Sequence, residues 1–292
     1  MIGAVPIVTF DTSAHNRVAD DPRRRSVVNG INAGLWFRFA GLSIEELYAT
    51  SQQSERESLL ASCRSLQSGP SECLLPPNKL TEQLVMAHHN DPEHFDWRTV
   101  NVRWPLCEDA IRDRQFFDDE ETSRAQPDFQ KERKRAGRDD LVALRPEIQA
   151  IFESNGESPP TTFRPALSRL EAIGDGGSLL YAARRLYERA VGSAADKAMV
   201  REFMDCCPSF RALVYAIFVP WYNIAVRDFR FGEKLSAGNN DLFMSMYLPY
   251  CDWFVTDDKG QATSLREVAA HAGLETDVLM YDEFCGSLLA TV

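Results

Sequence analysis

The hydrophobic pattern divides the chain into two ends with short apolar runs and a middle with helical periodicity. The first apolar run, 4–10, is rich in β-branched residues and ends on Asp11, Thr12 and Ser13. Unbroken apolarity over so few residues is typical of a strand covered on both faces of a parallel sheet. The polar residues after it are of the kind that begin helices. This stretch predicts a buried strand followed directly by a helix, rather than a signal peptide.

Three further elements are expected before residue 67. The run 36–44 predicts a second strand, and Ser43 with Glu46 three residues later resembles a capping box at the start of a helix. Apolar residues at helical spacing predict an amphipathic helix over 54–66. The N-terminal part is therefore expected to alternate between strands and helices.

The middle of the chain, about Thr81 to Leu235, has few β-branched runs and predicts helices. The densely charged stretch 113–140 mixes both signs, which is typical of an exposed helix or a connector. The stretch 154–165 is rich in Pro and Ser and predicts a loop. Two later prolines, Pro208 and Pro220, are expected to interrupt a long helical segment, because proline lacks the amide donor.

Alternation of strands and helices returns after residue 236. A helix is expected to begin at Asn239 or Asn240, followed by a strand over 253–258. The stretch 263–273 predicts a helix that ends at its glycine, and 276–284 predicts a last strand with a short helix after it. Strand, helix and strand at this spacing indicate parallel pairing with a right-handed crossover.

We therefore predict an α/β protein with three layers and a central parallel sheet. Residues 1–66 and 236–292 are expected to form the α/β core, and 67–235 a large, mostly helical insertion. In such sheets, ligands bind at the carboxyl ends of the strands. The first predicted strand ends on an aspartate, and the predicted strand 253–258 ends on two.

Four acidic residues from separate segments are expected to meet at this edge. They are Asp11 and Asp258 at strand ends, and Asp241 and Glu46 near helix starts, with Glu45 as the alternative to Glu46. Oxygen ligands suit hard cations such as Mg²⁺ and Mn²⁺, which keep several waters. Without a cation, gathered carboxylates would raise one another's pKa. The sequence therefore predicts a cation site here.

The stretches IVTFDTSAHNRV, LSIEELYAT and NDLFMSMYLPYCDWFVTDD, in this order, resemble the sequence blocks of PIN-like nuclease domains. That family has an N-terminal strand ending in Asp, followed by a small hydroxyl residue. It then has a Glu in an "EL" pair at a helix start, and late in the chain an Asp before a strand that ends in Thr-x-Asp. The resemblance extends over about 120 residues at the two ends of the chain and covers none of the central helices. The matching positions here are Asp11 with Thr12 and Ser13, Glu46, Asp241, and Thr256 with Asp257 and Asp258.

The resemblance implies a PIN-like fold and metal-dependent hydrolysis of phosphodiester bonds, most often in RNA. It implies catalytic roles for Asp11, Glu46, Asp241 and Asp258, with the three aspartates holding Mg²⁺ or Mn²⁺. Bound magnesium lowers the pKa of water and neutralises charge in the transition state, so no protein nucleophile is needed. Accessory positions around these acids are Asp257, Thr12, Ser13, Asn16 and Thr256, with His15 as a further residue that lines the site or lies on the surface.

The composition limits which partners fit. A net charge of −11 argues against a general nucleic-acid coat or a membrane-surface protein. Arg23, Arg24 and Arg25 nevertheless form a short basic patch that can contact a phosphate backbone. We expect RNA as the substrate, with single-stranded DNA as the second candidate. A protein partner, such as an antitoxin, is expected on the helical insertion of a toxin or defence nuclease, and a homo-oligomer is compatible with the sequence. Seven scattered cysteines indicate reduced thiols and a cytoplasmic protein.

Each acid also has a purely structural interpretation. Asp11 can cap the helix after it, Asp241 can be a first-turn acid, and the Asp257–Asp258 pair can form a solvated turn. The corresponding alternative function is an inactive PIN-like scaffold that binds through its helical insertion. A phosphatase of related fold needs a second Asp two residues after the first, where this chain has Ser13. His88, His89 and His94 suggest zinc only weakly, because no cysteine pair accompanies them.

Overall fold

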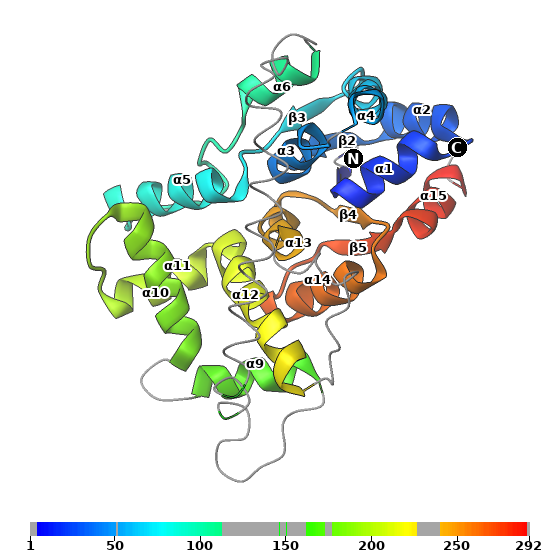
Figure 1. The fold of residues 1–292 in the computed structure, drawn as a ribbon. Helices are drawn as coiled ribbons and strands as arrows, with labels where there is room; N and C mark the ends of the chain where they lie inside the picture. Colours follow the sequence, from blue (N-terminus) through cyan, green and yellow to red (C-terminus); the bar gives the residue numbers. More distant parts are fainter. Residues whose placement is uncertain are drawn as a thin grey trace.

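The computed structural model shows an α/β fold around one sheet (Figure 1). It describes residues 5–50, 52–112, 162–172, 177–226 and 240–290, together with Pro146 and Ala150. The charged stretch 113–140 and most of the predicted loop at 154–165 lie outside the described residues.

The sheet has five strands in the order β3-β2-β1-β4-β5, and every neighbouring pair is parallel. The strands are β1 (Ile7–Phe10), β2 (Trp36–Phe39), β3 (Ser71–Cys73), β4 (Trp253–Thr256) and β5 (Asp277–Met280). The predicted parallel sheet built from both ends of the chain is therefore confirmed. At its centre β1 pairs with β4, in a register that places Phe10 opposite Val255.

Helices cover both faces of this sheet, which gives three layers (Figure 1). One face is covered by α1 (Thr12–Asp20), α2 (Arg24–Gly34), α4 (Gln53–Leu66), α6 (Pro105–Arg112) and α15 (Tyr281–Ala290). The other face meets a second core, built by α5 (Pro77–Asn90), α9 (Phe163–Ala172), α10 (Gly177–Val191), α11 (Lys197–Cys206), α12 (Pro208–Val226), α13 (Asn240–Phe243), the 3₁₀ helix η3 (Met244–Tyr250) and α14 (Lys259–Ala272). Of these, α14 packs on β4 and β5, whereas α10 and α11 lie further from the sheet, against α5 and α12. The helix α3 (Gly41–Tyr48) contributes side chains to both cores.

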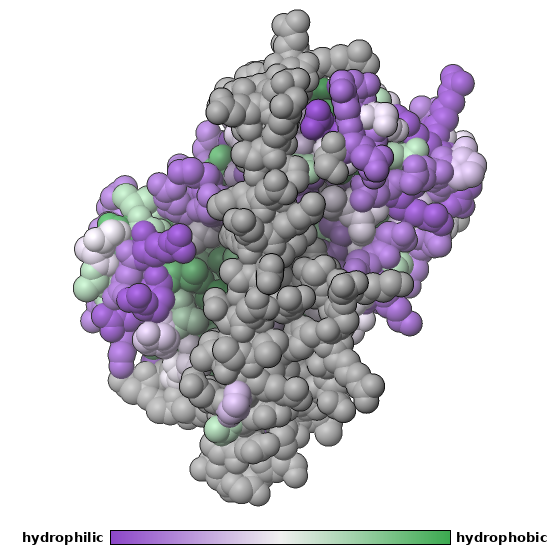
Figure 2. All heavy atoms as spheres, in the orientation of Figure 1, coloured by the Kyte–Doolittle hydropathy of each residue, from purple (hydrophilic) through white to green (hydrophobic). Residues whose placement is uncertain are grey.

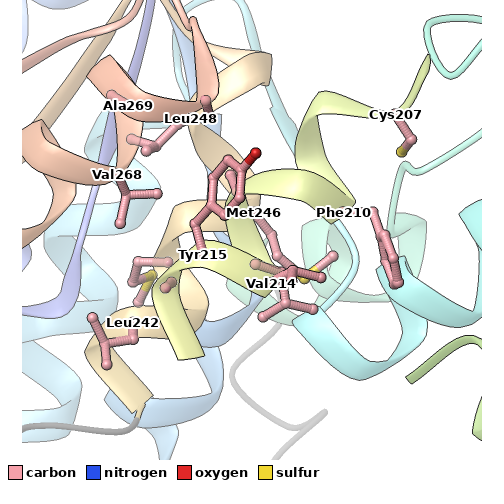
Figure 3. Close-up of a cluster of buried hydrophobic side chains, with 14 of the residues drawn as sticks. Cys207, Phe210, Val214, Tyr215, Leu242, Met246, Leu248, Val268 and Ala269 are labelled. Atoms are coloured by element: carbon pink, nitrogen blue, oxygen red, sulfur yellow. The ribbon is translucent and has the colours of Figure 1, made fainter. Parts of the chain in front are cut away.

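The two apolar cores follow the alternation of side chains along the strands. Val8 and Phe10 of β1 point into the core beneath α1, α2, α4 and α15, and Val255 of β4 joins them. Phe254 points the opposite way, into the core shared with α12 and α14. Figure 3 shows part of this second core, where side chains of α12, such as Val214 and Tyr215, gather with Met246 of η3 and Val268 of α14. Both faces of the central strands are therefore buried, as their unbroken apolarity predicts.

The central helices are not a separate body. The edge strand β3 falls within 67–235, yet it pairs with β2 through Phe37 and Ser71, so the sheet takes one strand from the range assigned to the insertion. The helix α12 packs against both α14 and η3. The predicted N-terminal part of the α/β core ends at residue 66. In the structure this part extends at least to Cys73, because β3 belongs to the sheet. The signal for β3 was weak because Ser-Glu-Cys has no apolar pattern.

Only the first of the two prolines interrupts the helical segment as predicted: α11 ends at Cys206, and a new helix, α12, begins at Pro208. Pro208 begins α12, a position where the missing amide donor has no intrahelical acceptor in any case. Pro220 lies inside α12 and does not end it. The surrounding residues of α12 are largely buried, among them Phe218 and Val219, so tertiary packing offsets the lost backbone hydrogen bond.

The predicted capping box at Ser43 does not form. The helix α3 begins two residues earlier, at Gly41, and no side chain caps it. The Ser43 hydroxyl instead donates to the carbonyl oxygen of Phe10 at 3.1 Å. An early start is possible because Gly41 lets the helix approach the backbone that follows β3.

Gly41→Ala is expected to destabilise the protein by about 2–3 kcal/mol, because the new methyl group overpacks a rigid contact. A Cβ atom at this position would lie 2.4 Å from the carbonyl oxygen of Leu74 and 2.6 Å from the amide nitrogen of Pro76. The matched control is Gly34→Ala, whose Cβ would meet nothing within 4 Å. Urea unfolding should show a loss for Gly41→Ala and a neutral or stabilising effect for Gly34→Ala. Equal stability of the two variants would contradict the close approach at Gly41.

The surface is dominated by polar residues over the described parts of α1, α2 and α15 (Figure 2). All seven cysteines are free thiols, as predicted, and only Cys206 is exposed. Among the described helices, none is by itself long and apolar enough to cross a membrane. One bent pair, α11 with 208–220 of α12, meets the length and composition criteria together.

Candidate functional site

The candidate site lies where the chain order of the sheet reverses. From β1 the chain continues to β2 and β3 on one side, whereas β4 and β5 extend the other side. The amide of Asp11 continues the β1–β4 ladder by donating to the carbonyl oxygen of Val255 at 3.0 Å. The carboxyl ends of β1 and β4 therefore lie side by side, at the type of switch point where open α/β sheets bind ligands.

Asp11 is the most buried of the predicted acids whose side chains the structure describes, with 3% of its surface exposed. It caps α1, and its Oδ1 accepts from the amide of Ala14 at 2.8 Å. Ser13 Oγ lies 2.9 Å from both carboxylate oxygens, and Thr256 Oγ1 donates to Oδ2 at 2.8 Å. The structural interpretation, a helix cap, is thus correct for Asp11. The second oxygen, however, takes part in a network that crosses to β4.

The electrostatics of Asp11 are unusual for a capping residue. Burial raises the pKa of its carboxyl group to about 6, although hydrogen bonds from Ala14, Thr256 and Ser13 act in the opposite direction. Within the described residues no lysine, arginine or histidine forms an ion pair with this carboxylate. A buried carboxylate held only by neutral donors is a place where a cation would be stabilising.

Thr256, the last residue of β4, links three parts of the site. Its hydroxyl oxygen accepts from the amide of Asp258 at 3.0 Å, and it lies 2.6 Å from Gln261 Oε1 as well as 2.8 Å from Asp11. The hydroxyl has one proton and two acceptor neighbours, so it donates to only one of them at a time. Gln261 is buried and was not predicted as a site residue. Its only sequence signal was its position three residues after an aspartate at a helix start.

Ser13 joins the first turn of α1 to the loop after β4. Its hydroxyl oxygen accepts from the amide of Asp257 at 2.7 Å and lies 3.1 Å from Thr256 Oγ1. The Asp257 side chain itself points outward and is exposed. The pair of aspartates is therefore divided by the structure, with Asp257 at the rim and Asp258 beside the buried network.

Asp258 caps α14, and its Oδ1 accepts from the amide of Gln261 at 2.9 Å. Its side chain is half-buried. The carboxyl groups of Asp11 and Asp258 thus begin the helices that follow β1 and β4. Because parallel strands present these helix starts at one edge, the carboxylate of Asp11 and the backbone amide of Asp258, 247 positions apart in sequence, both hydrogen-bond to the hydroxyl of Thr256.

Glu46 reaches the same region from α3. Its Oε2 accepts from the Thr12 hydroxyl at 2.5 Å, and Thr12 adjoins both Asp11 and Ser13. Both Glu45 and Glu46 are half-buried. The contact with Thr12 connects Glu46 to α1, which favours Glu46 as the acid of this block.

Asp241 lies in α13, but its side chain is outside the described residues. Among the residues that are described, no group of three or more His, Cys, Asp or Glu side chains lies close enough to hold a metal ion. The structure thus brings together Asp11, Thr256, Asp258 and Ser13, with Glu46 joined through Thr12.

Four residues that were predicted to contribute to the site, Asn16 and the patch Arg23–Arg25, lie elsewhere or have other contacts. Arg23 is held by Asp21 in a two-pronged ion pair, whose bonds measure 3.1 and 3.0 Å. The patch 23–25 follows α1, whereas Asp11 precedes it, and nine helical residues span about 13 Å. This separation argues against a direct role beside Asp11. Asn16 is exposed one turn along α1.

His15 is neither at the site nor on the surface. It is fully buried, its ring stacks on Phe39, and burial lowers its pKa to about 3. His88 is also buried, where its Nδ1 lies 3.0 Å from the hydroxyl of Tyr187. Both histidines therefore belong to apolar cores rather than to a zinc site.

In comparisons with known proteins, no family model matches the chain, and no curated protein or solved structure matches it either. The fold class consequently rests on the parallel sheet and its strand order. The function rests on the geometry around Asp11 and on the resemblance of the sequence blocks.

Proposed function

We propose that this protein is a PIN-like nuclease that hydrolyses RNA with Mg²⁺ or Mn²⁺. The observation that carries the proposal is Asp11, a buried carboxylate at the sheet's switch point that has no cationic partner within the described residues. The strand ending in Asp11 and the strand ending in Thr256-x-Asp258 lie side by side, as the resemblance to the family implies.

The residues that would hold the metal are Asp11 and Asp258, with Asp241 as the third ligand of the proposal. The candidate ligand atoms that the structure describes suit a hard cation, because they are carboxylate and hydroxyl oxygens. When bound, the metal supplies Lewis-acid polarisation of the phosphate and a water of lowered pKa.

The protein's own residues prepare this chemistry. Thr256 and Ser13 fix the orientation of the Asp11 carboxylate through their hydroxyl groups. Thr12 positions Glu46, which we assign to activation or orientation of the attacking water. Burial of Asp11 excludes bulk water from this side of the site, which strengthens its interaction with any bound cation.

The proposal predicts metal-dependent cleavage of labelled single-stranded RNA. Cleavage should occur in magnesium or manganese, stop in EDTA, and fall about a hundredfold or more in Asp11→Asn, because transition-state charge then loses its stabilising cation. The matched control is Asp20→Asn, which removes the same charge from the exposed far end of the same helix. Single-stranded DNA of the same sequence reports on the substrate class.

Two results would count against this proposal. Cleavage that persists in EDTA or in Asp11→Asn would come from another enzyme. Absence of cleavage with every substrate and metal would favour the alternative function, an inactive binding protein. That alternative is supported by the fact that Asp11 and Asp258 both cap helices.

A further inference from the structure

Arg17 provides a positive charge at the rim of the site. It follows Ser13 by four residues, so the two side chains share one face of α1. Its side chain is 46% exposed, and its Nε lies 3.9 Å from Oδ2 of Asp257. The amide of Asp257 in turn donates to Ser13 Oγ, which touches the Asp11 carboxylate. Arg17 therefore lies just outside the buried network and is connected to it through Asp257.

The ion pair of Arg17 with Asp257 is loose. A separation of 3.9 Å is at the outer limit of a salt bridge, and 39% of the Asp257 side chain is exposed. Exposed pairs of this kind contribute little to stability, because both groups are well solvated. Asp21, by contrast, holds Arg23 through two bonds near 3 Å. Arg17 is thus the easier of the two guanidinium groups to transfer to another anion.

We propose that Arg17 binds a phosphate of single-stranded RNA at the rim of the site, and that Asp257 competes with the RNA for this guanidinium. The inference rests on the proposed function and adds a substrate contact to it. A guanidinium group fits the phosphate because its N–H groups form two parallel bonds to the oxygens. A protein with a net charge of −11 repels RNA overall, so a cation beside the acids is needed to hold the backbone there.

Because Asp257 competes with RNA for the guanidinium group, substitutions of Arg17 and of Asp257 should change the RNA affinity in opposite directions. Arg17→Ala is expected to weaken binding about fivefold and to reduce the slope of log affinity against log salt by about 0.7, the value for one contact to a single strand. Asp257→Asn is expected to strengthen binding by about twofold, because the guanidinium is released. In the double variant, Asp257→Asn should bring no gain.

The measurement is fluorescence anisotropy of a short, labelled single-stranded oligouridylate, titrated with the full chain at several salt concentrations. Calcium replaces magnesium so that the RNA stays intact, and its integrity is checked on a gel. Arg201→Ala is the matched control, because Arg201 is an exposed arginine on α11, a helix that belongs to the other core. Arg17→Lys keeps the charge without the planar fork, and it should bind with intermediate affinity. Melting temperatures confirm that each variant is folded.

The outcomes separate this inference from the proposed function. If wild-type protein cleaves RNA while Arg17→Ala keeps wild-type affinity and salt slope, Arg17 is no substrate contact and only the inference fails. It also fails if Asp257→Asn strengthens binding equally in the Arg17→Ala background. If the wild-type chain neither binds nor cleaves RNA, the proposed function and the inference fail together.

Discussion

Asp11→Asn is expected to stabilise the protein at neutral pH while removing its response to magnesium. Burial raises the pKa of the Asp11 carboxyl group from 3.8 to about 6, so between these values the folded state binds more protons than the unfolded state. The stabilisation is complete below about pH 4 and is lost as the pH rises through about 6. At pH 7 the buried charge therefore costs on the order of 3 kcal/mol of unfolding free energy.

An asparagine side chain satisfies the hydrogen bonds around this position. Its carbonyl oxygen can accept from the amide of Ala14 and from Ser13 Oγ, as Oδ1 of the carboxylate does. Its amide group can donate to Thr256 Oγ1, whose own proton then goes to Gln261. We therefore expect a net gain of about 1–3 kcal/mol at pH 7 and little difference near pH 4.

Urea unfolding at about pH 4 and about pH 7 tests this expectation. In wild-type protein, magnesium or manganese should raise the unfolding free energy by about 2.7 kcal/mol at a hundred times the dissociation constant. Asp11→Asn should show no such gain, whereas Asp20→Asn should retain it. A variant that is less stable than wild type at pH 7, or that still responds to magnesium, would remove Asp11 from the proposed metal site.

Loss of stability in acid is expected to depend on His15, with an effect of up to about 4 kcal/mol near pH 3. Burial lowers the pKa of this imidazole from 6.5 to about 3, so the unfolded state binds more protons across this interval. The stability is therefore present above about pH 6.5 and is lost as the pH falls toward 3. The ring is surrounded by Phe10, Phe37 and Phe39, and its Nε2 has no partner among the described residues.

His15→Phe and His15→Leu should lack the acid destabilisation that this imidazole contributes between about pH 6.5 and about pH 3. Their absolute stabilities will differ, because the two side chains fill the site differently, but both remove the titrating group. His89→Phe is the matched control, since it makes the same replacement on the exposed side of α5. The measurement is unfolding free energy by urea at intervals from about pH 3 to about pH 7. A wild-type acid slope in both His15 variants would contradict the assignment.

The Asp11 carboxyl group and the His15 imidazole change the stability of the protein in opposite directions over the same pH interval. Between about pH 4 and about pH 6, acid stabilises the protein through Asp11 and destabilises it through His15. The wild-type profile should therefore be flatter there than the profile of either single variant. The Asp11→Asn profile should fall more steeply with acid, and the His15→Phe profile should rise.

Sequence reasoning located the elements whose signals are local. The apolar run before Asp11 and the one before Asp257 were identified as buried strands, because each is covered on both faces and carries no polar face. Gly273 was identified as the end of a helix, and it adopts a left-handed conformation with φ 66°. Each of these features depends on only a few neighbouring residues.

The predictions made from local sequence patterns are wrong at positions where contacts with distant residues override the local preference. Ser43 resembled a helix cap, but the approach of Gly41 to the backbone after β3 let the helix begin earlier. Pro220 resembled a helix break, but burial of α12 keeps the helix intact. His15 was expected at the site or on the surface, and the packing of α1 against the sheet placed it in the core instead. Helical periodicity alone does not specify which face of a short helix is buried.

The sequence by itself determined that Asp11 and Asp258 each follow a strand and precede a helix, because strand patterning and capping are local properties. Only the tertiary structure decided that the Asp11 carboxylate accepts from the hydroxyl of Thr256, two residues before Asp258, because parallel pairing of β1 with β4 joins residues about 245 positions apart. The same pairing set Arg17 opposite Asp257. The physical reason is the register of the backbone ladder, which fixes the relative height of two strand ends that no local pattern relates.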